Sequence, residues 1–231
     1  MMDAIILAGG FGTRLQSVVS DVPKPMAPVN GKPFLEILLK SLEKKGIRRV
    51  ILSVGYKAEI IMNYFGSSYG EIELLYEVED TPLGTGGAVR AALSKCITKK
   101  VLILNGDTYI NLDSHFLTTI NAMNDSNSII FGVEISDKVR YGSIEKDQSF
   151  IVTGFVEKGC AGPGVINSGY YIFPKKEFLE NSSDGAFSLE TIFLPKLVYE
   201  KKLRIEILAS LFIDIGIPED YKKAAELLRN I

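Results

Sequence analysis

The chain has 231 residues, of which 46% are hydrophobic and 23% charged, and its formal net charge is −2. This length and composition are typical of a soluble globular enzyme and exclude a disordered tail protein. Scattered lysines and arginines argue against a nucleic-acid-binding surface, and no apolar run approaches the roughly 20 residues that a membrane span needs.

Strand and helix patterns alternate along the first half of the chain. Short apolar runs predict strands, and apolar residues three or four positions apart predict helices. We expect strands over 4–8, 50–54, 72–76 and 101–104, and helices over 33–45, 58–65 and 86–93. This alternation is typical of a mostly parallel α/β sheet with helices on both faces, in which ligands bind at the carboxyl ends of the strands.

The second half is more antiparallel in character, with short connections between its strands. We expect strands over 128–135, 142–145, 151–157, 165–173 and 204–208, and helices over 175–180 and 189–201. A last helix is expected to begin at Pro218 and to run to the end, because proline suits the first turn of a helix. No repeat and no linker rich in Gly, Ser or Pro divides the chain, so we expect one mixed α/β domain over 1–231.

A glycine-rich loop follows the first strand. Gly9, Gly10 and Gly12 lie within four residues, and glycines let backbone N–H groups approach an anion closely. Arg14 and Lys24 add the positive charge that such an anion needs. The loop therefore predicts a cradle for phosphates, although it is neither the P-loop nor the dinucleotide-binding glycine motif.

Any metal ion is expected to be held by carboxylates. Cys96 and Cys160 fit no ligand spacing and favour a reducing cytoplasm, and His115 is interpreted as a surface residue. Asp107 follows an apolar strand, and Asp214 interrupts another apolar stretch, where an unpaired carboxylate is costly. The structural alternatives are a turn for Asp107 and a helix cap or ion pair for Asp214. Beside a phosphate loop, a Mg²⁺ ion shared by both acids is the better explanation.

Three weaker motifs have both a binding and a structural interpretation. The glycine run over 84–87 precedes a helix, so it either lets the backbone pass close to a nucleobase or forms a turn with Thr85 as N-cap. Glu157 and Asn167 can bind paired sugar hydroxyls, and Lys158 can bind a phosphate. The alternative for these last residues is an ordinary surface hairpin.

In chain order, these motifs resemble the signature of the sugar-1-phosphate nucleotidyltransferases. Each motif is weak alone, but the ordered set covers essentially the whole chain. The matching segments are Leu-Ala-Gly-Gly-Phe-Gly-Thr-Arg-Leu over 7–15, Pro-Lys-Pro-Met over 23–26, Gly-Thr-Gly-Gly over 84–87, Asn-Gly-Asp over 105–107, Tyr-Gly over 141–142, Glu-Lys over 157–158, Asn-Ser-Gly over 167–169 and Asp-Ile-Gly-Ile-Pro-Glu-Asp over 214–220.

The resemblance implies the Rossmann-like nucleotidyltransferase A fold, also called the nucleotide-diphospho-sugar transferase fold. It implies a nucleotide-binding half over about 1–110 and a sugar-phosphate-binding half over about 111–231. The implied reaction joins a nucleoside triphosphate and a sugar 1-phosphate, giving an NDP-sugar and pyrophosphate, with Mg²⁺ as cofactor.

The resemblance also implies roles for individual positions. The expected nucleotide-binding residues are Leu7, Gly9, Gly10, Gly12, Thr13, Arg14, Lys24, Gly84, Thr85 and Asp107. The expected sugar-phosphate-binding residues are Gly142, Glu157, Lys158 and Asn167, and the expected Mg²⁺ ligands are Asp107 and Asp214. The expected catalytic residues are Arg14 on the leaving pyrophosphate, Lys24 between the reacting phosphates, and Asp107.

The short motifs and the compact length are most similar to those of bacterial D-glycero-D-manno-heptose 1-phosphate guanylyltransferases, which make GDP-heptose for surface polysaccharide. Mannose-1-phosphate guanylyltransferases are an alternative, as are uridylyl- or thymidylyltransferases, including those that act on N-acetylmuramate 1-phosphate. A non-catalytic sugar-nucleotide-binding regulator is an alternative of another class. It predicts the loss of a phosphate-handling residue, whereas Arg14, Lys24, Asp107, Lys158 and Asp214 are all present. A homodimer is a candidate assembly.

Overall fold

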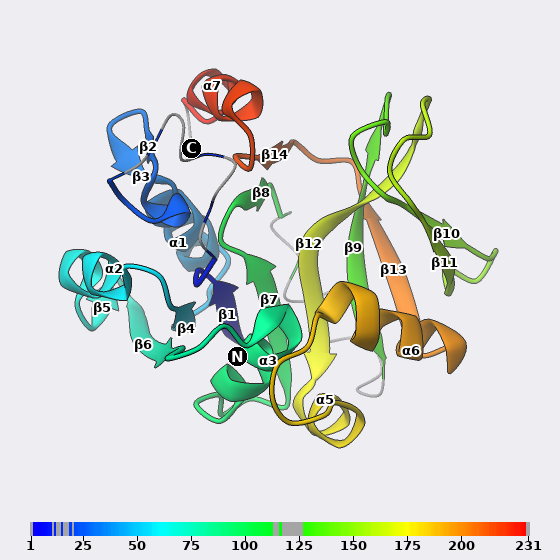
Figure 1. Cartoon of the computed structure of the whole chain (residues 1–231), viewed down its shortest axis with the longest axis horizontal. Helices are drawn as coiled ribbons and strands as arrows, with labels where there is room; N and C mark the ends of the chain where they lie inside the picture. The colour runs from blue at the N-terminus through cyan, green and yellow to red at the C-terminus, as the bar shows by residue number, and fades with distance from the viewer. Residues whose placement is uncertain are drawn as a thin grey trace.

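The computed structural model describes residues 2–10, 12, 15, 19, 21–112, 116 and 127–229 (Figure 1). Its strands are β1 (Asp3–Leu7), β2 (Pro28–Val29), β3 (Lys32–Pro33), β4 (Arg49–Val54), β5 (Ser68–Tyr69), β6 (Ile72–Val78), β7 (Lys100–Asn105), β8 (Thr108–Ile110), β9 (Ser128–Ile135), β10 (Ser143–Lys146), β11 (Val152–Val156), β12 (Gly164–Pro174), β13 (Leu203–Leu208) and β14 (Phe212–Asp214). Its helical segments are η1 (Lys24–Met26), α1 (Phe34–Lys44), α2 (Ala58–Phe65), α3 (Gly84–Leu93), α5 (Lys175–Asn181), η2 (Leu189–Phe193), α6 (Leu194–Tyr199) and α7 (Pro218–Leu227).

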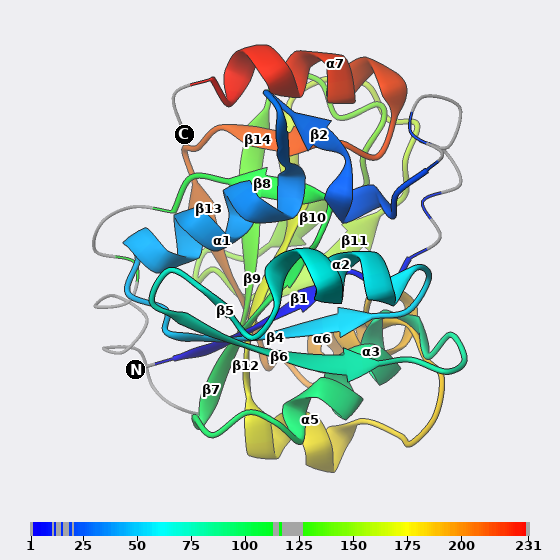
Figure 2. The same ribbon diagram turned by 90° about the vertical axis from the view of Figure 1, so that its left-hand side faces the viewer.

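Four parallel strands, in the order β7, β1, β4, β6, form the centre of the main sheet. Successive side chains of a strand point to opposite faces, so β1 contributes to two cores. Ala4 and Ile6 pack with residues of α1 and α2, whereas Ile5 packs with residues of α3, α5 and α6. In Figure 2, α1 and α2 lie above these strands, and α3 and α5 lie below them. Helices therefore cover both faces, as the alternating pattern predicts.

Antiparallel strands extend the sheet beyond β7. β12 pairs with β7, β9 pairs with β12, and the β10–β11 hairpin continues from the other end of β12. β13 then joins β9 in parallel, which completes ten strands within the described part of the chain. Two small ladders, β2–β3 and β8–β14, lie outside this sheet. The mixed parallel and antiparallel α/β fold expected from the sequence is confirmed.

The structure differs from the predicted elements at two places in the second half. The helix expected over 189–201 is a π-helical turn, η2, followed by the short helix α6. Pro195 explains the break, because proline has no N–H to donate to the carbonyl one turn earlier and the local hydrogen bonding must change. The last helix, α7, ends at Leu227 and lies over β14 and β2 (Figure 2).

Within the described part of the chain, none of the helices combines the length and the apolar composition needed to cross a membrane.

Candidate active site

A cavity of about 600 Å³ opens where β1, β4, β6 and β7 reach their carboxyl ends. This is the edge at which parallel sheets of this kind bind ligands. Eight of the expected nucleotide-binding residues line it, namely Leu7, Gly9, Gly10, Gly12, Lys24, Gly84, Thr85 and Asp107. The other two, Thr13 and Arg14, lie outside the described residues, as does His115.

Lys24 and Asp107 form an ion pair at the edge of this cavity. Asp107 lies in the turn between β7 and β8, so its expected place at a strand's end is confirmed. Lys24 lies in the 3₁₀ turn η1, and its side chain is only 10% exposed. Prolines at 23 and 25 restrict the backbone on both sides of the lysine. The ammonium group is therefore held in place by a rigid turn and by a carboxylate.

Gly12 of the glycine-rich segment lies directly against Lys24. Gly12 has a φ of +60°, and a Cβ added to it would lie 2.9 Å from the Cβ of Lys24. A larger residue would be strained in the backbone and would collide with the lysine stem. Glycine at this position brings the loop and the cation together.

Asp214, far along the chain, is brought to the same place by β14. In the β8–β14 ladder it pairs with Thr108, and the next amide, that of Ile215, donates to the carbonyl oxygen of Asp107 at 3.0 Å. The Asp214 carboxylate accepts from the Gly216 amide at 2.6 Å and does not cap α7, whose N-cap is Ile217. The helix-cap alternative for Asp214 is therefore wrong for α7.

The Lys24 ammonium, paired with Asp107, also lies close to the Asp214 carboxylate. A Cβ added to Gly216 would lie 3.0 Å from Lys24 Nζ and 2.6 Å from Asp214 Oδ1. The structure thus gathers Lys24, Asp107 and Asp214 around one point beside the cavity.

The donor set at this point fits a Mg²⁺ ion that is completed by a substrate. Two carboxylates lie where a cationic side chain already sits, which shows that the location accepts positive charge. In the part of the chain that the structure describes, no group of three or more His, Cys, Asp or Glu residues could hold a metal. Mg²⁺ commonly takes one or two carboxylates and fills its remaining positions with phosphate oxygens and water.

The expected sugar-phosphate residues gather where β10 begins and β11 ends, beside the first half of β12. Ser143 of β10 pairs with Val156 of β11 and with Ile166 of β12. One position further, Gly142 therefore lies beside Glu157 and Asn167. None of the expected sugar-phosphate residues is among those that line the cavity of 600 Å³.

Asn167 makes structural hydrogen bonds, whereas Glu157 and Lys158, directly after β11, are open to solvent. Its amide nitrogen donates to the Tyr171 hydroxyl at 2.7 Å, and its amide oxygen accepts from the Gly169 amide at 2.9 Å. Glu157 and Lys158 are exposed. Binding of a sugar phosphate by these residues stays a prediction.

The glycine run at the start of α3 packs against protein. The amides of Gly86 and Gly87 donate to the Phe187 carbonyl at 2.9 and 3.3 Å. A Cβ added to Gly86 would lie 2.0 Å from the Phe187 ring. The N-cap of α3 is Leu83, so the alternative role of Thr85 as N-cap is wrong. Three glycines of the run, Gly84, Gly86 and Gly87, therefore make room for the segment that contains Phe187.

The change Gly86→Ala is expected to destabilise the fold by about 1–3 kcal/mol, because the new methyl group overpacks a rigid contact. Urea unfolding followed by circular dichroism measures this free energy. Gly10→Ala is the matched control, since a Cβ added at Gly10 meets nothing within 4 Å. Equal losses of stability in the two variants would contradict the packing role.

Glu79 is a candidate binding residue that the sequence motifs missed. It follows β6, lines the cavity, and accepts hydrogen bonds from the Ser53 hydroxyl and the Leu83 amide, each at 3.0 Å. The strand was expected to end at 76, so the acid was not placed at a strand's carboxyl end. An acid three residues before the Pro-Leu-Gly-Thr-Gly-Gly run over 82–87 was the available signal.

The chain matches the nucleotidyl transferase family over residues 3–230. It is 42% identical over 220 residues to the D-glycero-alpha-D-manno-heptose 1-phosphate guanylyltransferase of Campylobacter jejuni, which covers 95% of this chain and 97% of the relative. It is 43% identical over 229 residues to the protein of the same name from Aneurinibacillus thermoaerophilus, which covers 99% of both.

A solved structure shows the same fold over the full length. The crystal structure of HddC from Yersinia pseudotuberculosis has a TM-score of 0.89 and 44% identity, covering 99% of this chain and 100% of that one. The structure of HddC complexed with GMP-PN has a TM-score of 0.87 at the same identity and coverage. These likenesses confirm the expected nucleotide-diphospho-sugar transferase fold. The chain belongs to the nucleotidyl transferase family.

Proposed function

We propose that this protein transfers GMP from GTP to D-glycero-D-manno-heptose 1-phosphate, releasing pyrophosphate and forming the GDP-sugar. The observation that carries the reaction type is the cluster of Lys24, Asp107 and Asp214 beside a cavity lined by the glycine loop. The names of the two relatives support the sugar and the nucleotide. The GMP-PN complex of HddC further supports a guanine nucleotide.

The reaction needs positioning and positive charge more than a base. A phosphate oxygen of the sugar 1-phosphate forms a bond to the α-phosphorus of GTP, and the bond from that phosphorus to the bridging oxygen of pyrophosphate breaks. The attacking group is already an anion, so no residue has to remove a proton. We propose that the Lys24 ammonium exchanges its contact with Asp107 for one with the α-phosphate of GTP. There its positive charge would offset the repulsion between the two phosphate groups.

Asp107 and Asp214 would hold a Mg²⁺ ion, which supplies further positive charge to the triphosphate when it is bound. Arg14 is proposed to contact the leaving pyrophosphate. Gly142, Glu157 and Asn167 are proposed to bind sugar hydroxyls, and Lys158 the sugar phosphate.

A panel of assays tests this proposal. Pyrophosphate release is measured with Mg²⁺ for GTP, UTP, dTTP and CTP, each with heptose, mannose and N-acetylmuramate 1-phosphates. The fastest turnover is expected for GTP with the heptose phosphate. Faster turnover with another pair of substrates would change the proposed nucleotide or sugar. No turnover with any pair would overturn the enzymatic function.

Glu79 supports guanine as the base. Guanine presents two adjacent donors, N1–H and the 2-amino group, and a carboxylate is an acceptor that can meet both. Glu79 lies on the wall of the cavity beside the first residues of α3. We infer that its carboxylate binds the guanine edge.

The change Glu79→Gln is expected to raise the KM for GTP about tenfold or more, because a hydrogen bond to a charged group is worth roughly 1.5–3 kcal/mol. ITP lacks the 2-amino group, so its KM is expected to rise less. Steady-state pyrophosphate release with each nucleotide gives both values. Asp80→Asn, at the neighbouring exposed acid, is the control. Equal changes for GTP and ITP would contradict guanine recognition by Glu79.

We also infer that the enzyme works in the cytoplasm, where nucleoside triphosphates are supplied. Its two cysteines, buried Cys96 and exposed Cys160, are free thiols. A single catalytic domain over 1–231 and a homodimer stay predictions.

A further inference from the structure

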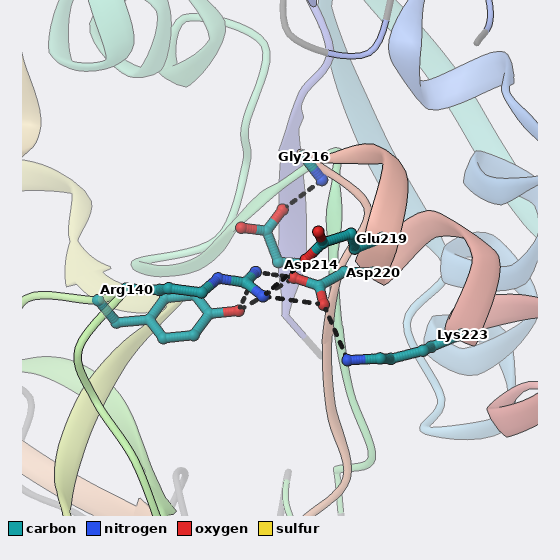
Figure 3. A network of polar contacts seen from close by, with 7 residues as sticks. Arg140, Asp214, Gly216, Glu219, Asp220 and Lys223 are labelled. Carbon is teal, nitrogen blue, oxygen red and sulfur yellow. Dashed lines mark hydrogen bonds and ion pairs between the residues drawn. The ribbon is translucent and has the colours of Figure 1, made fainter. Parts of the chain in front are cut away.

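Arg140 and Asp220 form a clasp between two distant parts of the chain (Figure 3). Arg140 lies in the connection between β9 and β10, and Asp220 lies in the first turn of α7. One guanidinium nitrogen of Arg140 donates to Asp220 Oδ1 at 3.3 Å, and the other contacts Oδ2. The Asp220 side chain is only 14% exposed. A forked, partly shielded pair of this kind fixes orientation as well as distance.

The Arg140 side of the clasp holds the two loops that carry three of the four proposed sugar-phosphate residues. Gly142 follows Arg140 by two positions in the same connection. The amide of Gly159 donates to the carbonyl of Val139 at 3.0 Å, which ties the β11–β12 connection to the β9–β10 connection. Glu157 and Lys158 directly precede Gly159. A displacement of Arg140 would therefore move all three proposed sugar-phosphate residues of these loops.

The Asp220 side of the clasp is fixed to the catalytic cluster. α7 begins directly after the segment that contains Asp214 and Gly216, which Figure 3 shows close to the clasp. The body of α7 is also bonded to the β2–β3 hairpin, which follows Lys24 along the chain. The Tyr221 hydroxyl donates to the Pro28 carbonyl at 2.5 Å, and the Asn30 amide donates to the Ala225 carbonyl at 2.8 Å.

Tyr141 adds a second link at the same place. Its hydroxyl lies 3.4 Å from Asp220 Oδ2, and its ring meets that of Phe212 in β14 edge-on, with the centroids 5.6 Å apart. Burial raises the pKa of Tyr141 to about 12, so its hydroxyl stays protonated and can donate to the carboxylate at neutral pH. This aromatic contact should keep the two parts associated when Arg140 is changed.

We propose that the Arg140–Asp220 clasp is a positioning device that sets the sugar-phosphate loops against Lys24 and Asp214. In-line attack requires the two phosphates to be aligned closely, and a small misplacement is costly to the rate. Neither clasp residue lines the cavity in the described structure, so they act through the loops and not on the reacting atoms. The inference deepens the proposed function and rests on it.

Steady-state kinetics of Arg140→Met, Asp220→Asn and the double variant test the clasp. The KM for the sugar 1-phosphate is expected to rise on the order of tenfold in each single variant. A rise of this size matches the interaction energy that is typical of residues in one hydrogen-bonded network. The KM for GTP is expected to stay within about twofold, because neither Arg140 nor Asp220 lines the cavity that the nucleotide-binding residues form. The double variant should be no worse than the single ones, and Arg140→Lys should recover part of the loss.

Arg49→Met is the matched control, since it removes an Arg–carboxylate pair of 2.8 Å with Glu73 at the end of β4 remote from the cavity. It should change neither KM. Unchanged kinetics in the clasp variants would overturn the positioning role of the clasp. Equal rises in the KM values for GTP and for the sugar 1-phosphate would also overturn it. Wild-type protein inactive with every substrate pair would instead count against the proposed function. Melting temperatures of all variants identify any that lose the fold. Asparagine is nearly isosteric with aspartate, so Asp220→Asn is expected to stay folded and to keep the clasp testable if Arg140→Met unfolds.

Discussion

Replacing Lys24 with methionine is expected to lower kcat about a thousand-fold, because a preorganised charge at a reacting centre is worth roughly that much. Methionine keeps most of the length and the apolar stem of a side chain that is only 10% exposed. The backbone of η1 is restricted by its prolines, so the turn should keep its shape without the ammonium group. Pyrophosphate release at saturating GTP and heptose 1-phosphate measures kcat, and circular dichroism follows the fold.

Lys32→Met is the matched control for this change. Lys32 lies on the surface, where its side chain is 59% exposed and pairs with Glu36 at 2.7 Å. An exposed ion pair of this kind contributes little to the free energy of unfolding, so both the stability and the kcat of Lys32→Met should be close to those of the wild type. A Lys24→Met enzyme that keeps its kcat within about tenfold of the wild type would contradict a role for this lysine at the phosphates.

The strands that build the catalytic edge could be predicted because each carries its own local signal. The apolar runs before Gly9 and before Asp107 are strands that end where the loops begin. Parallel strands present their carboxyl ends at one edge, so the two loops had to meet. The meeting of Asp107 with Asp214 is different, because β8 and β14 are only three residues long and pair across a large sequence separation. No local pattern predicts that pairing; the cost of an unpaired carboxylate beside a phosphate loop, together with the family resemblance, indicated that the two acids meet.

The sequence could not show what the glycines over 84–87 face. A glycine allows close approach by a ligand or by protein alike. Here the neighbour of Gly86 is Phe187, which belongs to a much later segment. The identity of such a neighbour depends on the tertiary fold, which a local motif does not encode.

The Arg140–Asp220 ion pair could not be predicted from the sequence either. Arg140 is one of many scattered basic residues, and Asp220 follows Pro218 as an ordinary first-turn acid of a helix. Only the placement of α7 beside the β9–β10 connection makes them partners. The irregular start of α6 was signalled by Pro195, but the apolar spacing on either side of it favoured one continuous helix.

Replacing Asp107 with asparagine is expected to lower kcat about a thousand-fold, since it removes a charge from the reacting centre. Two causes are combined in this variant, because Asp107 would hold the metal and also pairs with Lys24. Asp214→Asn separates them, as it leaves the Lys24–Asp107 pair in place. It is expected to raise the Mg²⁺ concentration for half-maximal activity on the order of a hundred-fold. Pyrophosphate release measured over a series of Mg²⁺ concentrations gives both quantities.

The dependence on metal concentration decides between the two causes. If Asp107 and Asp214 share a Mg²⁺ ion, both variants should regain part of their activity when Mg²⁺ is raised or replaced by Mn²⁺, because mass action compensates for a lost ligand. If Asp107 serves only to orient Lys24, its loss should be the same at every metal concentration, and Asp214→Asn should follow the wild-type curve. Asp184→Asn, at an acid that is 92% exposed and pairs with Arg90, should leave that curve unchanged. A wild-type curve for Asp214→Asn would therefore remove Asp214 from the metal site while leaving the proposed role of Lys24 intact.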